Sequence, residues 1–264
     1  MIDIFEGLIE MVNKNELFNT SPEEEKIVHS DLKYSPEINL ESSYQITYDA
    51  LPHESIEKLP PPVQDRAEEL HELAQTQPLR VIAPLLDLIE KYPDVPVFYN
   101  YLTAAYEMTG QRKKTEAIIE EAYQKHPDYL FAKTNYAIQC LRNQTPEKIS
   151  DVFDHKFNLK LLYPHRQIFH IAEFASFKAV MVLYHLAIGQ REVAKKYFNI
   201  LQELEPEHYL TKTVKHQLYP SIFRKFWSKA ENYLTNLDRR LDRKMAFLEK
   251  DDIRKRYSNY SKEF

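Results

Sequence analysis

The sequence predicts an all-α fold built from antiparallel helix pairs, and three observations support this prediction. First, the 264 residues include only three glycines, well below the usual share of about 7%. Second, Gly110 and Gly189 are each followed seventeen residues later by a proline, Pro127 and Pro206. Third, the stretch between each glycine and its proline carries apolar residues at helical spacing. A helical protein needs glycine mainly where one helix ends and the chain reverses, so this usage fits helices joined by short turns.

The composition excludes several classes of protein. Apolar residues make up 43% and charged residues 28% of the chain, which is typical of a soluble globular protein. So few glycines argue against phosphate-cradling loops and dinucleotide-binding turns. The net charge of −5 argues against nucleic-acid binding by the whole chain. No stretch approaches the roughly 20 apolar residues of a membrane span, and the N-terminus lacks the basic start of a signal peptide. We therefore expect a cytoplasmic protein without a cofactor.

Residues 1–60 are expected to form a separate N-terminal part. Residues 1–15 carry an apolar stripe that predicts a short amphipathic helix, formed by Ile2, Phe5, Leu8, Ile9 and Val12. Residues 16–60 are rich in proline, serine and glutamate with little periodicity, which predicts an irregular or extended segment. The stretch "SYQITYDAL" (43–51) could form a strand, but the sequence shows no partner for it.

Residues 62–218 hold the predicted helix pairs. Apolar residues at helical spacing predict helices over residues 63–75, 79–93, 95–110, 111–127, 174–189 and 190–206, with a further helix from residue 130. Pro84 interrupts the second of these, and it either begins the regular part of the helix or kinks it.

The unit of helix, turn, helix and proline has a period of 34 residues, as between Pro93 and Pro127, which is typical of helical-hairpin arrays. At this point the sequence resembles the tetratricopeptide repeat (TPR) family. Counted from Pro96, the residue types usual in that family occur at Tyr99, Leu102, Tyr106, Gly110, Ala122 and Pro127. Thr103 and Thr115 depart from the small residues usual at two further positions. The resemblance implies a right-handed superhelical array in which the first helices of successive units line a concave groove.

One stretch of the repeat part does not fit the period. Pro127 and Pro206 are 79 residues apart, eleven more than two periods of 34. The helical pattern is lost over residues 151–167, where we expect a longer loop or a distorted second helix.

The resemblance also implies which side chains would face the groove: Val97, Asn100, Ala104, Glu107, Phe131, Thr134, Asn135 and Ile138. The apolar members could bury side chains of a peptide or helix, while the amides fix its register by hydrogen bonds. The predicted function is therefore non-catalytic protein–protein interaction or scaffolding, with an unidentified protein or peptide partner. The chain's own N-terminal segment or C-terminal helix could instead fill the groove.

Residues 219–264 form the third predicted part, which is basic. Residues 221–260 contain eleven Lys and Arg against six Asp and Glu, and leucines spaced by three and four over residues 226–248 predict a long amphipathic helix. Three interpretations stay open for it. It caps the end of the array, it makes a coiled coil with a second copy or a partner, or it binds nucleic acid or another anionic surface.

A metal-dependent enzyme is the third function class, with a site in residues 151–173. His170 and Glu173 would share one helical face, but His165 would not align with them. A single His-x-x-Glu pair needs further ligands, and no second such pair occurs in the chain. We therefore expect no metal site and no catalytic residue, and we interpret Cys140 as a buried packing group.

Overall fold

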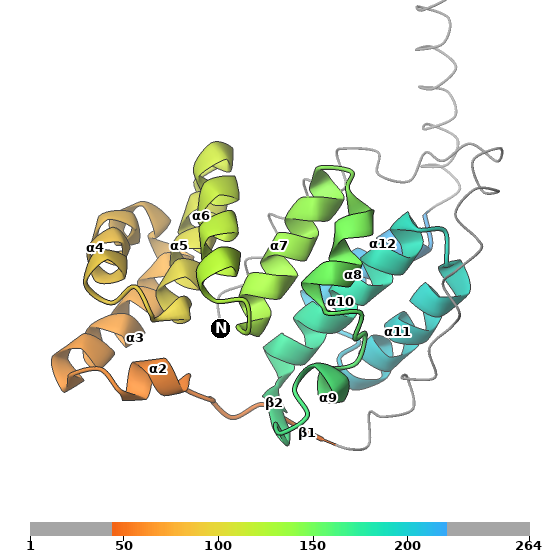
Figure 1. Ribbon diagram of the computed structural model, residues 1–264, viewed down its shortest axis with the longest axis horizontal. Coiled ribbons are helices and arrows are strands. Elements are labelled where there is room, and N and C mark those ends of the chain that lie inside the picture. The colour runs from red at the N-terminus through yellow and green to blue at the C-terminus, as the bar shows by residue number, and fades with distance from the viewer. Residues whose placement is uncertain (1–43, 221–264) are drawn as a thin grey trace, which may run out of the picture. The chain divides into compact units, whose positions relative to one another are not determined.

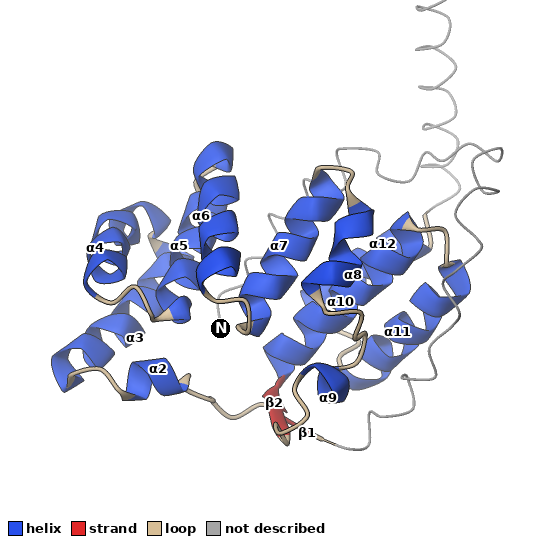
Figure 2. Cartoon of the chain, in the orientation of Figure 1, coloured by secondary structure: helices blue, strands red, loops and turns tan. Residues whose placement is uncertain are grey.

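The computed structural model describes residues 44–220, and most of these lie in helices (Figure 2). The mostly helical fold predicted from the sequence is confirmed. In chain order the helices are α2 (Glu54–Glu57), α3 (Pro61–Thr76), α4 (Pro78–Lys91), α5 (Pro96–Met108), α6 (Arg112–Lys125), α7 (Leu130–Arg142), α8 (Ile149–Val152), α9 (Leu159–Leu162), α10 (Ile171–Ala187), α11 (Arg191–Leu204) and α12 (Tyr209–Leu218). A 3₁₀ helix, η3 (Pro146–Lys148), and two strands, β1 (Gln45–Thr47) and β2 (Ile168–His170), complete the set. The helices predicted over residues 1–15 and 226–248 lie outside the described residues.

Gly110 and Gly189 end α5 and α10, as the sequence predicts. Their φ angles are +68° and +76°, a conformation that glycine adopts without a clash of a β carbon. The N–H of Gln111 donates to the carbonyl of Tyr106 at 2.9 Å, and that of Gln190 to the carbonyl of His185 at 2.7 Å. These bonds satisfy carbonyls that the end of a helix would leave unpaired.

A third turn has the same geometry without a glycine. Gln144 lies thirty-four residues after Gly110 and has a φ of +56°. The N–H of Thr145 donates to the carbonyl of Cys140 at 2.9 Å, as at the two glycine turns. The turns after α5 and α7 are therefore 34 residues apart, although no glycine marks the second one.

Helix α4 carries a proline in its interior and an apolar stripe on its outer side. The helix runs through Pro84, so the alternative in which this proline begins the helix is wrong. On the side away from the core, Leu79 is 71% exposed and Leu86 is 45% exposed. These two leucines stand two turns apart on one helical face.

The longer helices pack in chain order, each against its neighbours (Figure 1). Alternate helices also touch, since α3 contacts α5, α5 contacts α7, α7 contacts α10 and α10 contacts α12. Helix α7 is the most enclosed of the longer helices, because every residue in it except Tyr136 is buried. The side chains of these helices share one apolar core. Among residues 44–220, no helix combines the length and the apolar character needed to cross a membrane.

The regular alternation stops after α7, where the sequence predicts a longer loop or a distorted helix. Instead of one long helix the chain forms the short elements η3, α8 and α9, followed by a loop into β2. Phe153 and Phe169 from this insertion are fully buried. The ring of Phe153 meets the ring of Phe177 on α10 edge-on at 5.5 Å between centroids. Aromatic packing thus fixes the insertion against the helices.

The predicted strand in the N-terminal part finds its partner in this same insertion. Strand β1 pairs in parallel with β2, with Ile46 opposite Phe169. The ring of Tyr44 lies edge-on to that of Phe169 at 5.1 Å between centroids. The expectation of an irregular course is therefore wrong where residues 45–47 and 54–57 form β1 and α2. The sequence shows no partner because the pairing joins segments that are far apart along the chain.

Candidate functional site

The candidate site is the face that α5 and α7 present along their line of contact, where the sequence places its predicted groove residues. The structure brings two of them together, since Nδ2 of Asn135 donates to Oδ1 of Asn100 at 3.1 Å. Asn100 is 5% exposed and Asn135 is 3% exposed. The amide pair therefore links the two helices inside the folded chain rather than at an open surface.

The other predicted residues of this face are enclosed as well. Glu107 is partly exposed as a whole residue, and the remaining five have the exposure of core residues: Val97 7%, Ala104 0%, Phe131 7%, Thr134 0% and Ile138 0%. Apolar and polar side chains thus alternate over a face that is covered in the folded chain.

A buried ion pair lies at the end of the face and includes a residue that the sequence analysis missed. An oxygen of Glu107 lies 3.6 Å from a guanidinium nitrogen of Arg142, and the two side chains are 4% and 2% exposed. Burial raises the pKa of Glu107 and lowers that of Arg142, and in each case the opposite charge of the partner works against the shift. Arg142 could have been found from its position in the sequence. It follows Glu107 by thirty-five residues, the same separation as between Asn100 and Asn135.

Three oxygen acceptors on this face are buried without a hydrogen-bond partner among the described residues: Asn135 Oδ1, Gln139 Oε1 and Glu107 Oε2. Asn135, Gln139 and Arg142 follow one another at spacings of four and three, so they form one stripe on α7. Native proteins leave few buried polar atoms unpaired, because each one costs about 1–3 kcal/mol. The stripe therefore holds acceptors for which the described residues supply no donor.

A buried cation lies on α10, the next helix against α7. Lys178 has no exposed surface. Its Nζ lies 5.3 Å from the ring centroid of Phe174, 5.8 Å from that of Phe177 and 5.2 Å from that of Tyr197. Arg142, the buried cation on α7, is paired with Glu107.

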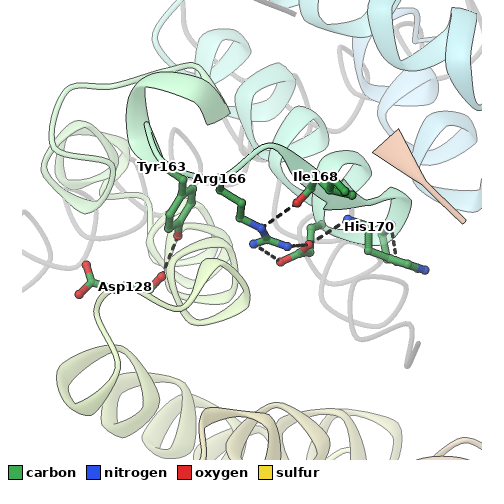
Figure 3. A network of polar contacts seen from close by, with 7 residues as sticks. Asp128, Tyr163, Arg166, Ile168 and His170 are labelled. Carbon is green, nitrogen blue, oxygen red and sulfur yellow. Dashed lines mark hydrogen bonds and ion pairs between the residues drawn. The ribbon is translucent and has the colours of Figure 1, made fainter. Parts of the chain in front are cut away.

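His170 and Glu173, the pair considered for an enzyme, form the start of α10, and Figure 3 labels His170 in the polar network there. Nδ1 of His170 accepts from the N–H of Ala172 at 3.1 Å, and Oε2 of Glu173 accepts from the N–H of His170 at 3.0 Å. Arg166 donates to both oxygens of Glu173, with the Nη1–Oε1 contact at 2.8 Å. This reciprocal capping leaves the carboxylate engaged in helix structure.

Arg166 connects this network to the first residue of β2, and Tyr163 connects the insertion to the turn between α6 and α7 (Figure 3). Nε of Arg166 donates to the carbonyl of Ile168 at 2.9 Å, and the hydroxyl of Tyr163 donates to the carbonyl of Asp128 at 2.9 Å. Within residues 44–220, no three His, Cys, Asp or Glu side chains gather in a way that could hold a metal ion.

The predicted basic segment, residues 219–264, with its capping, coiled-coil and nucleic-acid alternatives, lies beyond α12 and almost wholly outside the described residues. Comparison of the chain with models of protein families, with curated proteins and with solved structures found no match.

Proposed function

We propose that this chain is a non-catalytic adaptor that binds a peptide or a helix of a partner protein along the face of α5 and α7. We also propose that α3 to α12 form a right-handed superhelical array of the TPR kind. The shared turn geometry at Gly110, Gln144 and Gly189 supports the repeat, as does the contact between alternate helices. The cytoplasmic location stays a prediction.

The observation that carries the binding proposal is the set of buried acceptors without donors on α5 and α7. A peptide backbone presents N–H donors at regular intervals, and a helix presents unpaired N–H groups at its N-terminus. Either ligand could satisfy Asn135 Oδ1 and Gln139 Oε1. The apolar side chains Val97, Phe131 and Ile138 beside them would receive the ligand's apolar residues.

The experiment compares two double variants of the full chain for binding to one purified partner. Partners are first captured by chemical crosslinking, identified by mass spectrometry and purified for isothermal titration calorimetry. Asn100→Ala/Asn135→Ala removes both amides of the face. Lys113→Ala/Glu120→Ala removes two exposed charges of α6 and serves as the matched control.

The proposal predicts that the asparagine variant binds its partner up to about tenfold more weakly, because the hydrogen bond to Asn135 Oδ1, of about 0.5–1.5 kcal/mol, is lost together with the Asn100 amide that positions Asn135. The α6 variant should bind like the wild type. Circular dichroism confirms that both variants are folded at the temperature of the titration. Equal affinity of the folded asparagine variant and the wild type contradicts the proposal.

A further inference from the structure

We propose that residues 44–60 form a strap that is fastened at neutral pH and released at mildly acidic pH, when His53 and His170 become protonated. The strap runs from β1 through α2 to the start of α3 (Figure 1). Among its residues only Tyr44 and Leu59 are buried. A segment with so few buried side chains has a low local stability, so a small number of contacts decides whether it stays in place. The inference does not depend on the proposed binding role of α5 and α7.

The strap is fastened at three places. At one end, β1 pairs with β2, whose last residue is His170. In the middle, the ring of His53 lies edge-on to that of Tyr129 at 5.2 Å between centroids. At the other end, Nε2 of Gln64 on α3 donates to the carbonyl of Leu59 at 2.7 Å. A histidine is therefore present at the first two places.

Both histidines cap a helix through Nδ1, which accepts a hydrogen bond only in the neutral ring. Nδ1 of His170 accepts from the N–H of Ala172 at 3.1 Å, at the start of α10, and Nδ1 of His53 accepts from the N–H of Ser55 at 3.2 Å, at the start of α2. A protonated ring carries a hydrogen on both nitrogens, so neither bond can form. Its positive charge is also unfavourable at the N-terminus of α10. The hydroxyl of Ser55, 2.7 Å from Nδ1, can accept from the protonated ring, so the cap of α2 weakens less than the cap of α10.

The surroundings of His170 keep its ring neutral at neutral pH. Burial lowers its pKa, although the carboxylate of Glu173 and a hydrogen bond of the ring to the backbone of Tyr48 act in the opposite direction. The Glu173 carboxylate is itself held by Arg166. Tyr48 directly follows β1, so the ring of His170 contacts the strap as well as α10. The side chain is partly exposed, so a proton can reach it without unfolding of the chain.

The ring of His53 is kept neutral in a similar way. Burial lowers its pKa, and the positive charges of Arg166 and His126 act in the same direction. The carboxylates of Glu54 and Glu173 oppose the shift without cancelling it. This side chain is also partly exposed, so both histidines can respond to the pH of the solution.

The direction of the effect follows from the lowered pKa of both residues. In the released strap each histidine regains its ordinary pKa of 6.5, so release is coupled to proton uptake. The fastened strap is therefore most favoured above pH 6.5, and its advantage falls as the pH drops below this value.

Hydrogen exchange of the full chain, followed by nuclear magnetic resonance, tests the strap at two amides. The N–H of Gln45 donates to the carbonyl of Gln167 at 2.8 Å and reports on the pairing of β1. The N–H of Ile56 donates to the carbonyl of His53 at 2.8 Å and reports on α2. Each exchange rate is divided by that of the unstructured chain at the same pH, which gives a protection factor.

Two variants separate the strap from other effects of acid. In His53→Asn/His170→Asn, asparagine supplies a capping oxygen that does not titrate. His208→Asn is the matched control, because Nδ1 of His208 accepts from the N–H of Leu210 at 3.3 Å, at the start of α12 and outside the strap. Loss of global stability through His185 is common to all three proteins and cancels when they are compared.

Between about pH 7.5 and about pH 5, the protection of Gln45 in the wild type should fall about tenfold relative to the double variant. The protection of Ile56 should fall with it, and His208→Asn should behave like the wild type. In the wild type, the ring signals of His53 and His170 should titrate over the pH range in which Gln45 loses its protection.

Three results would overturn the strap. The first is an equal pH dependence of Gln45 in the wild type and the double variant. The second is a loss of protection confined to one of the two amides, because a strap is released as one segment. The third, which needs only the wild type, is a pair of histidine rings that stay neutral down to about pH 5.

Discussion

The side-chain amide of Asn135 donates to Oδ1 of Asn100 at 3.1 Å and so joins α7 to α5. Because both residues are buried, removing one leaves the other without this partner. We expect Asn100→Ala and Asn135→Ala each to lower the free energy of unfolding by about 1–3 kcal/mol. The double variant should lose about 1 kcal/mol less than the sum of the two losses. Urea denaturation gives the free energy of unfolding of the wild type, the two single variants and the double variant. Strictly additive losses would show that the two amides are not coupled.

The turn after α7 should be improved by a glycine. Gln144 has a φ of +56°, and a residue with a β carbon pays about 1–2 kcal/mol in this conformation. Gln144→Gly should therefore raise the free energy of unfolding by about 1 kcal/mol. Gly110→Ala should lower it by a similar amount. No atom lies within 4 Å of a β carbon added there, so only the backbone strain is measured. Chemical denaturation measures the stability of both variants. A Gln144→Gly variant less stable than the wild type would contradict the positive φ at this residue.

His185 makes stability depend on pH. Burial lowers its pKa from 6.5 to about 4, although its hydrogen bond to Gln190 acts in the opposite direction. The unfolded chain therefore takes up a proton at this residue at a higher pH than the folded chain does. The stabilisation of the folded state is fully present above pH 6.5 and falls as the pH drops toward 4, by up to about 3 kcal/mol.

The variant His185→Phe isolates this contribution, because phenylalanine retains a ring to stack on Tyr197, 5.3 Å away. The difference in unfolding free energy between wild type and variant should shrink as the pH falls from 6.5 to 4. The contributions of the other histidines are the same in both proteins, so they cancel in this difference. A difference that stays constant over this range would show that His185 does not titrate as described.

Glu173 should stabilise the junction between the insertion and the N-terminal strand. Glu173→Ala removes the contacts to Arg166 and the cap of α10. We expect a loss of about 1–3 kcal/mol, with the ion pair contributing modestly because the Arg166 side chain is 34% exposed. Glu173→Gln keeps an acceptor for the N–H of His170 and should lose less.

Hydrogen exchange of the Gln45 amide reports on this junction, because that amide donates to the carbonyl of Gln167 at 2.8 Å. Its exchange should quicken in Glu173→Ala and less so in Glu173→Gln. An unchanged rate in Glu173→Ala would mean that the network does not hold β2 in place.

The sequence predicts most of the helical architecture because its signals are local. Gly110 and Gly189 mark turns through the backbone freedom of glycine, and Pro127 and Pro206 follow helix ends because proline cannot continue a helix. The turn at Gln144 could not be predicted, because glutamine has no particular preference for a positive φ. The pairing of β1 with β2 could not be predicted either, because the two strands are far apart in the sequence.

The candidate site is predicted only in part. Asn100 and Asn135, both predicted for the same face, do meet as a hydrogen-bonded pair between α5 and α7. Arg142 and Gln139 were missed because a long polar side chain at the end of a helix resembles a solvated residue until its burial is known. The exposure of the predicted groove residues also depends on what covers them, and spacing within the helices does not contain that information.

Nuclear magnetic resonance of the side-chain amides tests most directly whether the face of α5 and α7 binds a ligand. The NH₂ signals of Asn100 and Asn135 are assigned from the two alanine variants. They are then followed as the full chain is saturated with an identified partner. We predict that both signals shift in step with binding. Saturation that leaves both signals in place would contradict the binding role of this face.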